Sequence, residues 1–283
     1  MTTTPEQYIS ELESLNIETI SRCNMEKDHC DECPIVARSE VFGNFVLPFD
    51  VITNLVKELS EHGYKGRTGF HHYSDPMVDK RIFDIVEMHI KLCPQAKTQI
   101  WTNGRLLSEE KAKRLLGLGL THLHITAYTD EELIKYRELA DNLRKSWPDV
   151  VYDICGGNLD SRMSIYTDEP NDITVGCPRI TDQLVIASSG DIQLCCWDWL
   201  RKNKFGNVKE HSLIEILKSS NFLSMRDDLM LGKRKKYYPC DRCTVQHGHA
   251  PDPPPKKKTA AGLEPITRTS WKTLLHQIDK FSP

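Results

Sequence analysis

The sequence predicts an α/β protein built around a partial (β/α)6 TIM-like barrel, followed by a small domain made of a β-hairpin and a helix. Two observations predict this class. Short β-branched or apolar segments alternate with amphipathic segments between residues 17 and 155, and each pair takes roughly 25–35 residues, a usual size for a βα unit. After about residue 165 the pattern changes to that of a hairpin. Strands that alternate with helices form a parallel sheet covered by those helices.

The elements of the barrel are bounded by residues that begin and end helices. Pro48 begins a helix whose apolar face precedes Gly63, and Ser108 begins another. Asp130 is expected to N-cap the fourth helix of the repeats. The expected strands lie at 17–21, 66–72, 98–101, 122–127 and 150–155. The expected helices lie at 1–16, 48–62, 78–92, 108–118 and from 130 onward.

The C-terminal region has a different pattern. Residues 184–195 predict a hairpin with a glycine-containing turn, and helices are expected at 212–218 and 222–231. The basic run at 233–236 is expected to face solvent. Residues 251–258, PDPPPKKK, predict an extended or disordered linker before a short tail helix at 270–281. The expected domains are therefore 1–165 for the barrel, 166–250 for the small domain and 251–283 for the linker and tail.

Composition narrows the class of partner. The chain has 283 residues and a net charge of −3, which offers no electrostatic reason to expect nucleic acid or an acidic membrane surface. No segment approaches the roughly 20 apolar residues that span a bilayer, and the N-terminal residues lack the pattern of a secretory signal. We therefore expect a cytoplasmic protein with no nucleic-acid or membrane partner.

The first cysteine group lies just after the first expected strand. Cys23 is followed by a polar loop and then by Cys30 and Cys33. Structural zinc takes four protein ligands, whereas three thiolates leave one coordination position open for chemistry. The group predicts an iron–sulfur cluster with one open iron at the C-terminal end of a barrel strand, where such barrels place their active sites. A zinc site that borrows His29 is the alternative.

A second group combines four cysteines of the small domain. Cys177 and Cys195 flank the hairpin, and Cys240 and Cys243 form a C-x-x-C pair. Four thiolates close a site, as in a [4Fe–4S] cluster or an all-thiolate zinc site. Cys196 is expected to point away from Cys195 if the strand is regular. The two remaining cysteines, Cys93 and Cys155, are interpreted as buried structural thiols.

Several motifs resemble a known family. They are ETISRCN (18–24), FHHYSDP (70–76), TNGRLLSEEKAKRLLGLGL (102–120), HLHITAY (122–128), the C-x12-G-x4-C spacing from Cys177 with the later C-x-x-C, and GNV (206–208). On these motifs the chain resembles the radical S-adenosylmethionine (SAM) enzymes, in the subgroup with a SPASM or shorter twitch domain. The resemblance covers about residues 15–246. It departs from the family in its first motif, which is C-x6-C-x2-C instead of C-x3-C-x2-C, and in Ser74-Asp75, which replace a Gly-Glu pair.

The resemblance implies a cofactor set. It implies that Cys23, Cys30 and Cys33 hold a [4Fe–4S] cluster whose fourth iron binds SAM, and that one electron cleaves SAM to a 5′-deoxyadenosyl radical that takes a hydrogen atom from substrate. It implies one auxiliary [4Fe–4S] cluster on Cys177, Cys195, Cys240 and Cys243. The residues implied to contact SAM are Tyr73, Ser74 and Asp75 at its methionine end, with Thr126 and Asn158 as further polar contacts. Thr126 is alternatively a plain strand residue, and no residue is assigned to catalysis.

The reaction implied is a net oxidation. An auxiliary cluster closed by four thiolates suits an electron acceptor, so the resemblance favours oxidation of a small molecule such as an alcohol or an aminocyclitol. A reductase such as flavodoxin or ferredoxin is the implied electron donor. Peptide cross-linking or epimerisation is the alternative within the family. A non-catalytic zinc or iron–sulfur protein is the alternative outside it, but that class does not explain why Cys23 follows a barrel strand.

Overall fold

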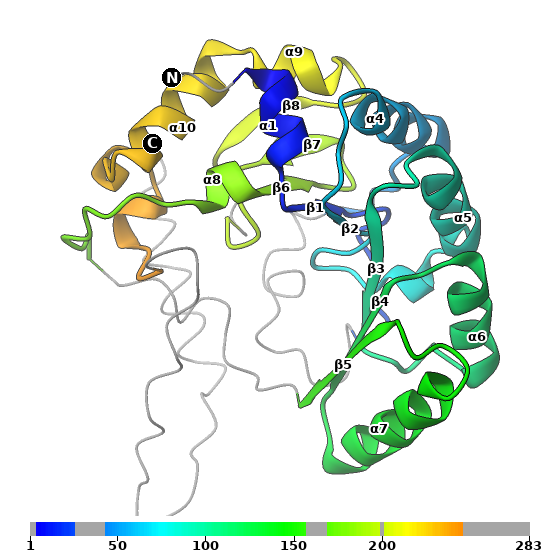
Figure 1. Cartoon of the computed structure of the whole chain (residues 1–283). Helices are drawn as coiled ribbons and strands as arrows, with labels where there is room; N and C mark the ends of the chain where they lie inside the picture. Colours follow the sequence, from blue (N-terminus) through cyan, green and yellow to red (C-terminus); the bar gives the residue numbers. More distant parts are fainter. Residues whose placement is uncertain (1–3, 26–42, 157–168, 199–200, 246–283) are drawn as a thin grey trace, which may run out of the picture.

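The computed structural model describes residues 4–25, 43–156, 169–198 and 201–245, which form an α/β fold around one eight-stranded sheet (Figure 1). The strand order is β5-β4-β3-β2-β1-β6-β7-β8. Neighbours from β5 to β6 run parallel, whereas β7 and β8 are antiparallel additions. The strands are β1 (Ser14–Ile17), β2 (Arg67–Gly69), β3 (Lys97–Thr102), β4 (His122–Ala127), β5 (Val151–Gly156), β6 (Gln183–Ile186), β7 (Asp191–Gln193) and β8 (Lys204–Asn207). The predicted fold class, an open and mostly parallel barrel-like sheet, is confirmed.

The sixth parallel strand comes from an unexpected part of the chain. β6 is the first strand of the predicted hairpin, and it pairs with β1 instead of following β5. The ladder continues past β1, because the Glu18 N–H donates to the Ile186 carbonyl at 2.8 Å. The C-terminal region therefore extends the barrel sheet at its β1 edge, and one sheet runs through both predicted domains.

The first strand is shifted from its expected place. β1 covers Ser14–Ile17, not 17–21, and beyond it Ile20 makes only an isolated bridge with Val46. The side chains of Leu15 and Ile17 are buried in the core. The strand therefore begins at Ser14, before the β-branched segment from which its start at residue 17 was predicted. Its partner β2 is only three residues long, which limits how far the pairing extends. Cys23 thus lies in the loop after the strand and not at its last residue.

Helices cover the convex side of the sheet between β1 and β5, as Figure 1 shows. They are α4 (Phe49–Glu61), α5 (Ile82–Leu92), α6 (Glu109–Leu118) and α7 (Asp130–Arg144). Ser108 caps α6 as predicted, since its hydroxyl accepts from the Lys111 N–H, and Gly119 ends that helix with φ of 108°. The predicted cap of α7 was wrong by one residue: Thr129 is the N-cap and accepts from the Glu132 N–H, which makes Asp130 the first helical residue.

The N-terminal helix packs against the C-terminal helices. Tyr8 of α1 (Pro5–Glu11) donates to the Ile180 carbonyl at 2.8 Å, and its ring meets the edge of Phe222 with centroids 5.4 Å apart. The C-terminal helices are α8 (Arg179–Asp182), α9 (Leu213–Leu217) and α10 (Ser220–Met230), followed by the 3-10 turns η2 (Arg234–Lys236) and η3 (Cys240–Arg242). The buried apolar residues of both halves belong to one cluster.

One prediction for the C-terminal region was wrong. Arg234, expected to face solvent with its basic neighbours, is only 2% exposed. Its guanidinium donates to the carbonyls of Val175 and Val245, at 3.1 and 2.6 Å, so hydrogen bonds compensate its burial. The predicted linker and the tail helix at 270–281 lie outside the described residues. No helix in the described ranges has the length and apolar character to cross a bilayer.

Candidate active site

The concave side of the sheet forms a cleft. Strand alternation turns Asn16 of β1, Gln99 and Trp101 of β3, and Gln183 of β6 to this side, while their sequence neighbours face the helices. The cleft encloses about 320 Å³, within the usual range of small-molecule pockets. The residues that line this lumen cleft are Ser14, Asn16, Arg67, His71, His72, Gln99, Trp101, Arg179, Gln183, Cys196 and Trp197.

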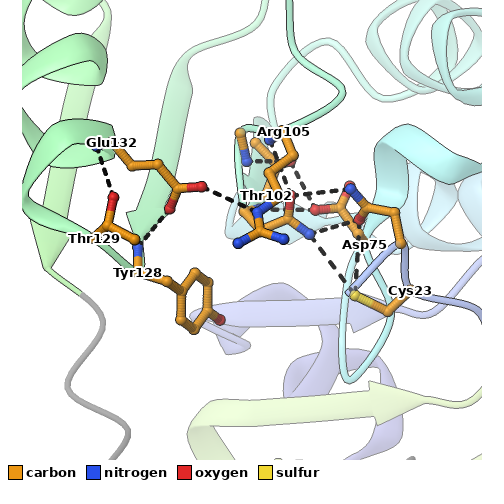
Figure 2. Close-up of polar contacts among 10 residues, drawn as sticks. Cys23, Asp75, Thr102, Arg105, Tyr128, Thr129 and Glu132 are labelled. Atoms are coloured by element: carbon orange, nitrogen blue, oxygen red, sulfur yellow. Dashed lines mark hydrogen bonds and ion pairs between the residues drawn. The ribbon is translucent and has the colours of Figure 1, made fainter. Parts of the chain in front are cut away.

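Asp75 joins two loops at the C-terminal edge of the sheet. Its Oδ2 accepts from the Thr102 hydroxyl and the Asn103 N–H, both at 2.8 Å, and its Oδ1 accepts from the Met77 N–H at 2.8 Å (Figure 2). The Asp75 N–H donates to the Arg22 carbonyl, beside Cys23. Burial raises the pKa of the Asp75 carboxyl. The carboxylate predicted to contact SAM is thus committed to hydrogen bonds that fix the loop after β3.

Cys23 lies within reach of that loop. The side-chain amide of Asn103 donates to the Cys23 Sγ at 3.7 Å and to the Asn24 Oδ1 at 2.7 Å. An amide N–H directed at a thiolate sulfur tunes a cluster ligand. Two predicted ligands of the same site, Cys30 and Cys33, lie outside the described residues, as does the predicted SAM contact Asn158.

The other two residues of the predicted methionine-end segment have different environments. Tyr73 is buried, and its hydroxyl donates to the Cys196 carbonyl at 2.7 Å. Ser74 is also buried, and its Oγ has no hydrogen-bond partner among the described residues. A buried hydroxyl without a partner is uncommon in a folded chain and fits a site that a polar ligand completes. Ser74 therefore fits its predicted role better than Tyr73 or Asp75.

An ion pair ties the loops after β3 and β4 together. The Arg105 guanidinium meets the Glu132 Oε1 at 3.0 Å, and the Glu132 Oε2 accepts from the Tyr128 N–H at 2.8 Å (Figure 2). The Thr129 hydroxyl accepts from the Glu132 N–H and so caps α7. These contacts fix the loops after β3 and β4 relative to each other.

Thr126 belongs to a polar group on the concave face. Its hydroxyl lies 3.3 Å from the His124 Nε2 and 3.9 Å from the Cys155 Sγ. The His124 Nδ1 lies 2.7 Å from the Asp153 Oδ2, and its ring stacks on Trp101 with centroids 4.1 Å apart. Trp101 in turn stacks on His71 at 4.8 Å. Thr126 is thus part of a contact network and not an isolated strand residue.

Gly69 makes room for this stack. A side chain at Gly69 would place its Cβ 2.6 Å from the His71 ring and 2.8 Å from the Gln99 amide. Glycine at the end of β2 therefore allows the His71 ring to lie flat against Trp101, with an angle of 5° between the ring planes.

The four cysteines of the small domain surround one cavity. Cys177 precedes α8, and Cys195 lies two residues after β7. Cys240 is the first residue of η3, and Cys243 follows its last residue. The residues that line this cysteine cavity are Cys177, Arg179, Ile180, Leu194, Cys195, Trp197, Asp198, Leu229, Arg234, Pro239, Cys240, Cys243 and Val245. Cys196 lines the lumen cleft instead. The two adjacent residues thus line different cavities, and because β7 ends at Gln193, regular strand alternation does not explain the difference.

The buried thiols of the cysteine cavity would need a bound metal to become thiolates. Burial raises the pKa of the Cys195, Cys240 and Cys243 thiols, because thiolates are costly in an apolar cavity without a cation. Arg234 supplies one buried positive charge at the wall. Burial also raises the pKa of Asp198 to about 6, although the N–H groups of Lys202 and Asn203 donate to it. Bound iron would supply the missing positive charge, so the donor set fits a cluster.

The two cavities share a wall. Arg179 and Trp197 line both the lumen cleft and the cysteine cavity. The Arg179 guanidinium lies over the Trp197 ring, 4.3 Å from its centroid. We refer to these two residues as the partition.

A buried charge network joins the barrel to the C-terminal region. The Glu18 Oε2 accepts from the Arg201 guanidinium at 3.0 Å and from the Ser188 hydroxyl at 2.8 Å, and the Glu18 Oε1 accepts from the Tyr73 N–H. The side chains of Glu18 and Arg201 are 0% and 3% exposed. Glu18, which follows β1, therefore connects the loop after β2 to the C-terminal region that contains the cysteine cavity.

Comparisons with known proteins agree with this geometry. Residues 177–244 match the SPASM iron–sulfur cluster-binding domain. The S-adenosyl-L-methionine-dependent 2-deoxy-scyllo-inosamine dehydrogenase of Niallia circulans is 26% identical over 239 residues, covering 81% of this chain and 91% of the relative. The solved structure of BtrN in complex with AdoMet and 2-DOIA is 26% identical, with a TM-score of 0.67 over 82% of this chain and 92% of that one.

Residues 177–244 thus match a SPASM domain, and over most of its length the chain is similar to enzymes of the radical SAM class. The relative is named as a SAM-dependent dehydrogenase, and the matched domain is named for binding an iron–sulfur cluster. A more distant solved structure, anSMEcpe with bound AdoMet, shares the fold at 14% identity, with a TM-score of 0.55 over 82% of this chain and 85% of that one. The cysteine cavity lies within the SPASM segment, which is where the donor set fits an auxiliary cluster.

Several residues of the candidate site were not predicted from the sequence. They include the partition, the Glu18–Arg201 pair, and His124 with Asp153. A signal for the last two exists in the sequence: HLHITA and YDIC alternate polar and apolar residues, whereas strands covered on both faces are continuously apolar. The alternation indicates that His124 and Asp153 lie on the polar face of the sheet. The interpretation of Cys155 as a plain buried thiol was incomplete, because Cys155 is only half-buried and contacts His124 at 3.3 Å.

Proposed function

We propose that this radical SAM enzyme oxidises a secondary alcohol of a small polyhydroxylated substrate to a ketone, with the substrate in the lumen cleft and the auxiliary cluster in the cysteine cavity. The observation that carries this proposal is the partition: only Arg179 and Trp197 line both cavities among the described residues. A cluster beside a substrate cleft suits the uptake of an electron from substrate, which net oxidation requires.

The cluster ligands are assigned from the geometry and the motifs together. Cys177, Cys195, Cys240 and Cys243 are the proposed ligands of the auxiliary cluster, because they line one cavity and Cys196 lines another. Cys23, with Cys30 and Cys33 from the segment outside the described residues, forms the proposed SAM-binding site. When bound, these groups supply the electron that cleaves SAM, the 5′-deoxyadenosyl radical that removes a substrate hydrogen atom, and the acceptor for one electron.

The protein's own residues position these groups. Asn103 donates to the Cys23 sulfur, and Asp75 fixes the loop that carries Asn103. The unpartnered Ser74 hydroxyl is the proposed polar contact for SAM. Tyr73, Asp75, Thr126 and Asn158 remain proposed SAM-site residues, with Tyr73 and Asp75 acting through the loop that they hold.

The lining of the cleft supports a small polar substrate. Asn16, Gln99 and Gln183 supply amide groups, which donate to and accept from hydroxyl groups. The enclosed volume of about 320 Å³ suits one small ring with its substituents. The curated relative is named for oxidation of 2-deoxy-scyllo-inosamine, an aminocyclitol of that kind. A reductase of the flavodoxin or ferredoxin type is the proposed electron donor.

The domain division follows from this assignment. We propose residues 1–165 as the radical SAM barrel, 166–250 as the SPASM domain and 251–283 as a linker and tail. The SPASM match at 177–244 lies inside the second range. Because β1 pairs with β6 and the core is continuous, the two domains are expected to unfold together.

The test is anaerobic reconstitution followed by an assay with SAM, dithionite and 2-deoxy-scyllo-inosamine. We expect about eight irons per chain, two four-iron clusters, and ketone formed together with 5′-deoxyadenosine. Other cyclitols and short peptides serve as comparison substrates under the same conditions. Modification of a peptide in place of a cyclitol would contradict the proposal, and zinc in place of iron would contradict the whole assignment.

Two cysteine variants separate the roles of the clusters. Cys23→Ala should abolish 5′-deoxyadenosine, since it removes a ligand of the SAM-binding cluster. Cys240→Ala should retain some 5′-deoxyadenosine but lose ketone, because the electron acceptor is lost. Cys93→Ala is the matched control: Cys93 is buried away from both cavities and should keep both products.

A further inference from the structure

We propose that Cys155 is the proton acceptor of the oxidation and that His124 and Asp153 position and polarise it. This inference rests on the proposed function, since it supplies the proton step which that reaction needs. The contacts form a line: the Asp153 Oδ2 lies 2.7 Å from the His124 Nδ1, and the His124 Nε2 lies 3.3 Å from the Cys155 Sγ. A thiol, an imidazole and a carboxylate in this order form the arrangement that activates a cysteine.

The sheet register creates this line. In the parallel pair of β4 and β5, Asp153 lies beside His124 and Cys155 lies beside Thr126. Residues two apart on a strand share a face, so these four side chains all project from the concave face. Tyr152 and Ile154, between them, pack against the core under the helices. The arrangement is therefore fixed by backbone pairing.

The Asp153 end of this line is exposed to solvent, whereas the His124 ring is covered by a neighbouring side chain. The His124 side chain is 10% exposed, whereas that of Asp153 is 61% exposed. Trp101 of β3 covers one face of the His124 ring, and Trp101 itself lines the lumen cleft. Cys155 is half-buried on the same concave face. The imidazole between the two ends is thus the most buried member of the line, and it connects Cys155 to the exposed carboxylate of Asp153.

The charges support a thiolate at Cys155. The hydrogen bond from His124 lowers the pKa of the Cys155 thiol, and the Cys155 and Asp153 contacts together raise the pKa of His124 despite its burial. The groups that face His124 are Asp153 and Cys155 from β5, Thr126 from its own strand and Trp101 from β3. Each of these shifts favours the charged form of the group, the thiolate at Cys155 and the imidazolium at His124.

The proposed step balances in atoms and electrons. After loss of its hydrogen atom to the 5′-deoxyadenosyl radical, the substrate is a carbon radical that bears a hydroxyl group. Its O–H bond breaks, the proton forms an S–H bond on Cys155, and the electron pair stays on oxygen. One electron is released as the C=O double bond forms, and an auxiliary iron–sulfur cluster, when bound, would be its acceptor. The proton then reaches solvent through His124 and exposed Asp153.

The first test needs no substrate. The reconstituted protein is treated anaerobically with iodoacetamide between pH 5 and 9, and alkylation at Cys155 is measured by mass spectrometry. We expect His124→Asn to slow alkylation of Cys155 at pH 7 by about tenfold for each unit by which its pKa rises. Cys93, which is buried, is the internal control and should react slowly in every variant. The matched control His122→Gln changes the same face of β4 two residues away and should leave the pH profile unchanged.

The second test follows the reaction itself in D2O, with SAM, dithionite and 2-deoxy-scyllo-inosamine. Cys155→Ser and His124→Asn should still form 5′-deoxyadenosine, but ketone per 5′-deoxyadenosine should fall at least tenfold. Full coupling in Cys155→Ser would overturn the assignment. Solvent deuterium on the substrate carbon would also overturn it, because Cys155 would then donate a hydrogen atom instead of accepting a proton.

The two tests distinguish failure of the inference from failure of the proposed function. If wild-type protein makes no ketone from any cyclitol, the proposed oxidation is wrong and the role of Cys155 in it falls as well. If wild-type protein makes ketone while His124→Asn changes neither the alkylation profile nor the coupling, the oxidation stands and the proton acceptor lies elsewhere.

Discussion

The hydroxyl of Tyr73 donates a hydrogen bond to the carbonyl oxygen of Cys196, 2.7 Å away. This bond joins the loop after β2, which also contains Ser74 and Asp75, to the residue that follows Cys195. The two proposed cluster sites are therefore linked by one side chain. Since Tyr73 is buried, the bond is shielded from water and contributes to the relative placement of the two halves.

Removing the Tyr73 hydroxyl should loosen this connection. Tyr73→Phe leaves the Cys196 carbonyl without its donor, which should lower the free energy of unfolding by about 1 kcal/mol. Thermal unfolding of the reconstituted protein should show a melting temperature roughly 2–4 °C lower. Tyr152→Phe is the control, because the Tyr152 hydroxyl bonds the nearby Trp147 carbonyl, away from both cavities. Equal melting temperatures for wild type and Tyr73→Phe would contradict the prediction.

The Glu18–Arg201 pair should contribute much more to stability than a surface pair. Arg201→Leu leaves the Glu18 carboxylate buried without its cation and should cost about 3–5 kcal/mol in urea unfolding. The double variant Glu18→Gln with Arg201→Leu should recover part of this loss, because no unpaired buried charge remains. Arg144→Leu, which breaks an exposed pair with Asp141, should cost at most about 1 kcal/mol. A similar small loss in Arg201→Leu would show that solvent reaches Glu18.

Iron content should separate Cys195 from Cys196. Cys195→Ser should lose roughly four of about eight irons per chain, because Cys195 lines the cysteine cavity. Cys196→Ser should keep all of them, because Cys196 lines the lumen cleft. The measurement is iron per chain after reconstitution, with the visible absorbance of the clusters as a second readout. The reverse pattern would exchange the two residues in the proposed ligand set.

Features of the fold that depend on neighbouring residues in the sequence were predicted, whereas features that depend on contacts between distant segments were not. Helix caps such as Ser108 and strand limits such as those of β4 follow from nearby residues, and they were predicted closely. The pairing of β6 with β1 joins segments about 170 residues apart, and no local pattern indicates it. The burial of Arg234 also depends on contacts between distant segments, since the carbonyls that accept its hydrogen bonds belong to residues 175 and 245.

The candidate site divides in the same way. Cysteine spacing identified the four residues that the structure places around one cavity, because a cluster demands a definite set of thiols. The roles of Arg179 and Trp197 arise only where two cavities meet, which spacing does not show. Asp75 was predicted as a SAM contact from its position in a motif, but its three accepted hydrogen bonds show that it fixes a loop.

His89 should make stability depend on pH in the acidic range. It lies on α5 with its ring nitrogens 2.9 Å from the hydroxyls of Thr68 and Thr98, and burial lowers its pKa to about 4. The unfolded chain takes up a proton near pH 6.5, whereas the folded chain does so only near pH 4. The stability from neutral His89 is therefore complete above pH 6.5 and is lost as the pH falls from 6.5 toward 4.

The size of this loss follows from the two pKa values. Between pH 7 and pH 5, His89 should account for about 2 kcal/mol of the decrease in the free energy of unfolding. His89→Gln removes the titrating group, so its decrease over that interval should be smaller by that amount in urea titrations. His211→Gln, at an exposed histidine, should decrease as the wild type does. An equal decrease in wild type and His89→Gln would mean that His89 accepts its proton in the folded state as readily as in the unfolded chain, and that the Thr68 and Thr98 hydroxyls accommodate the charged ring.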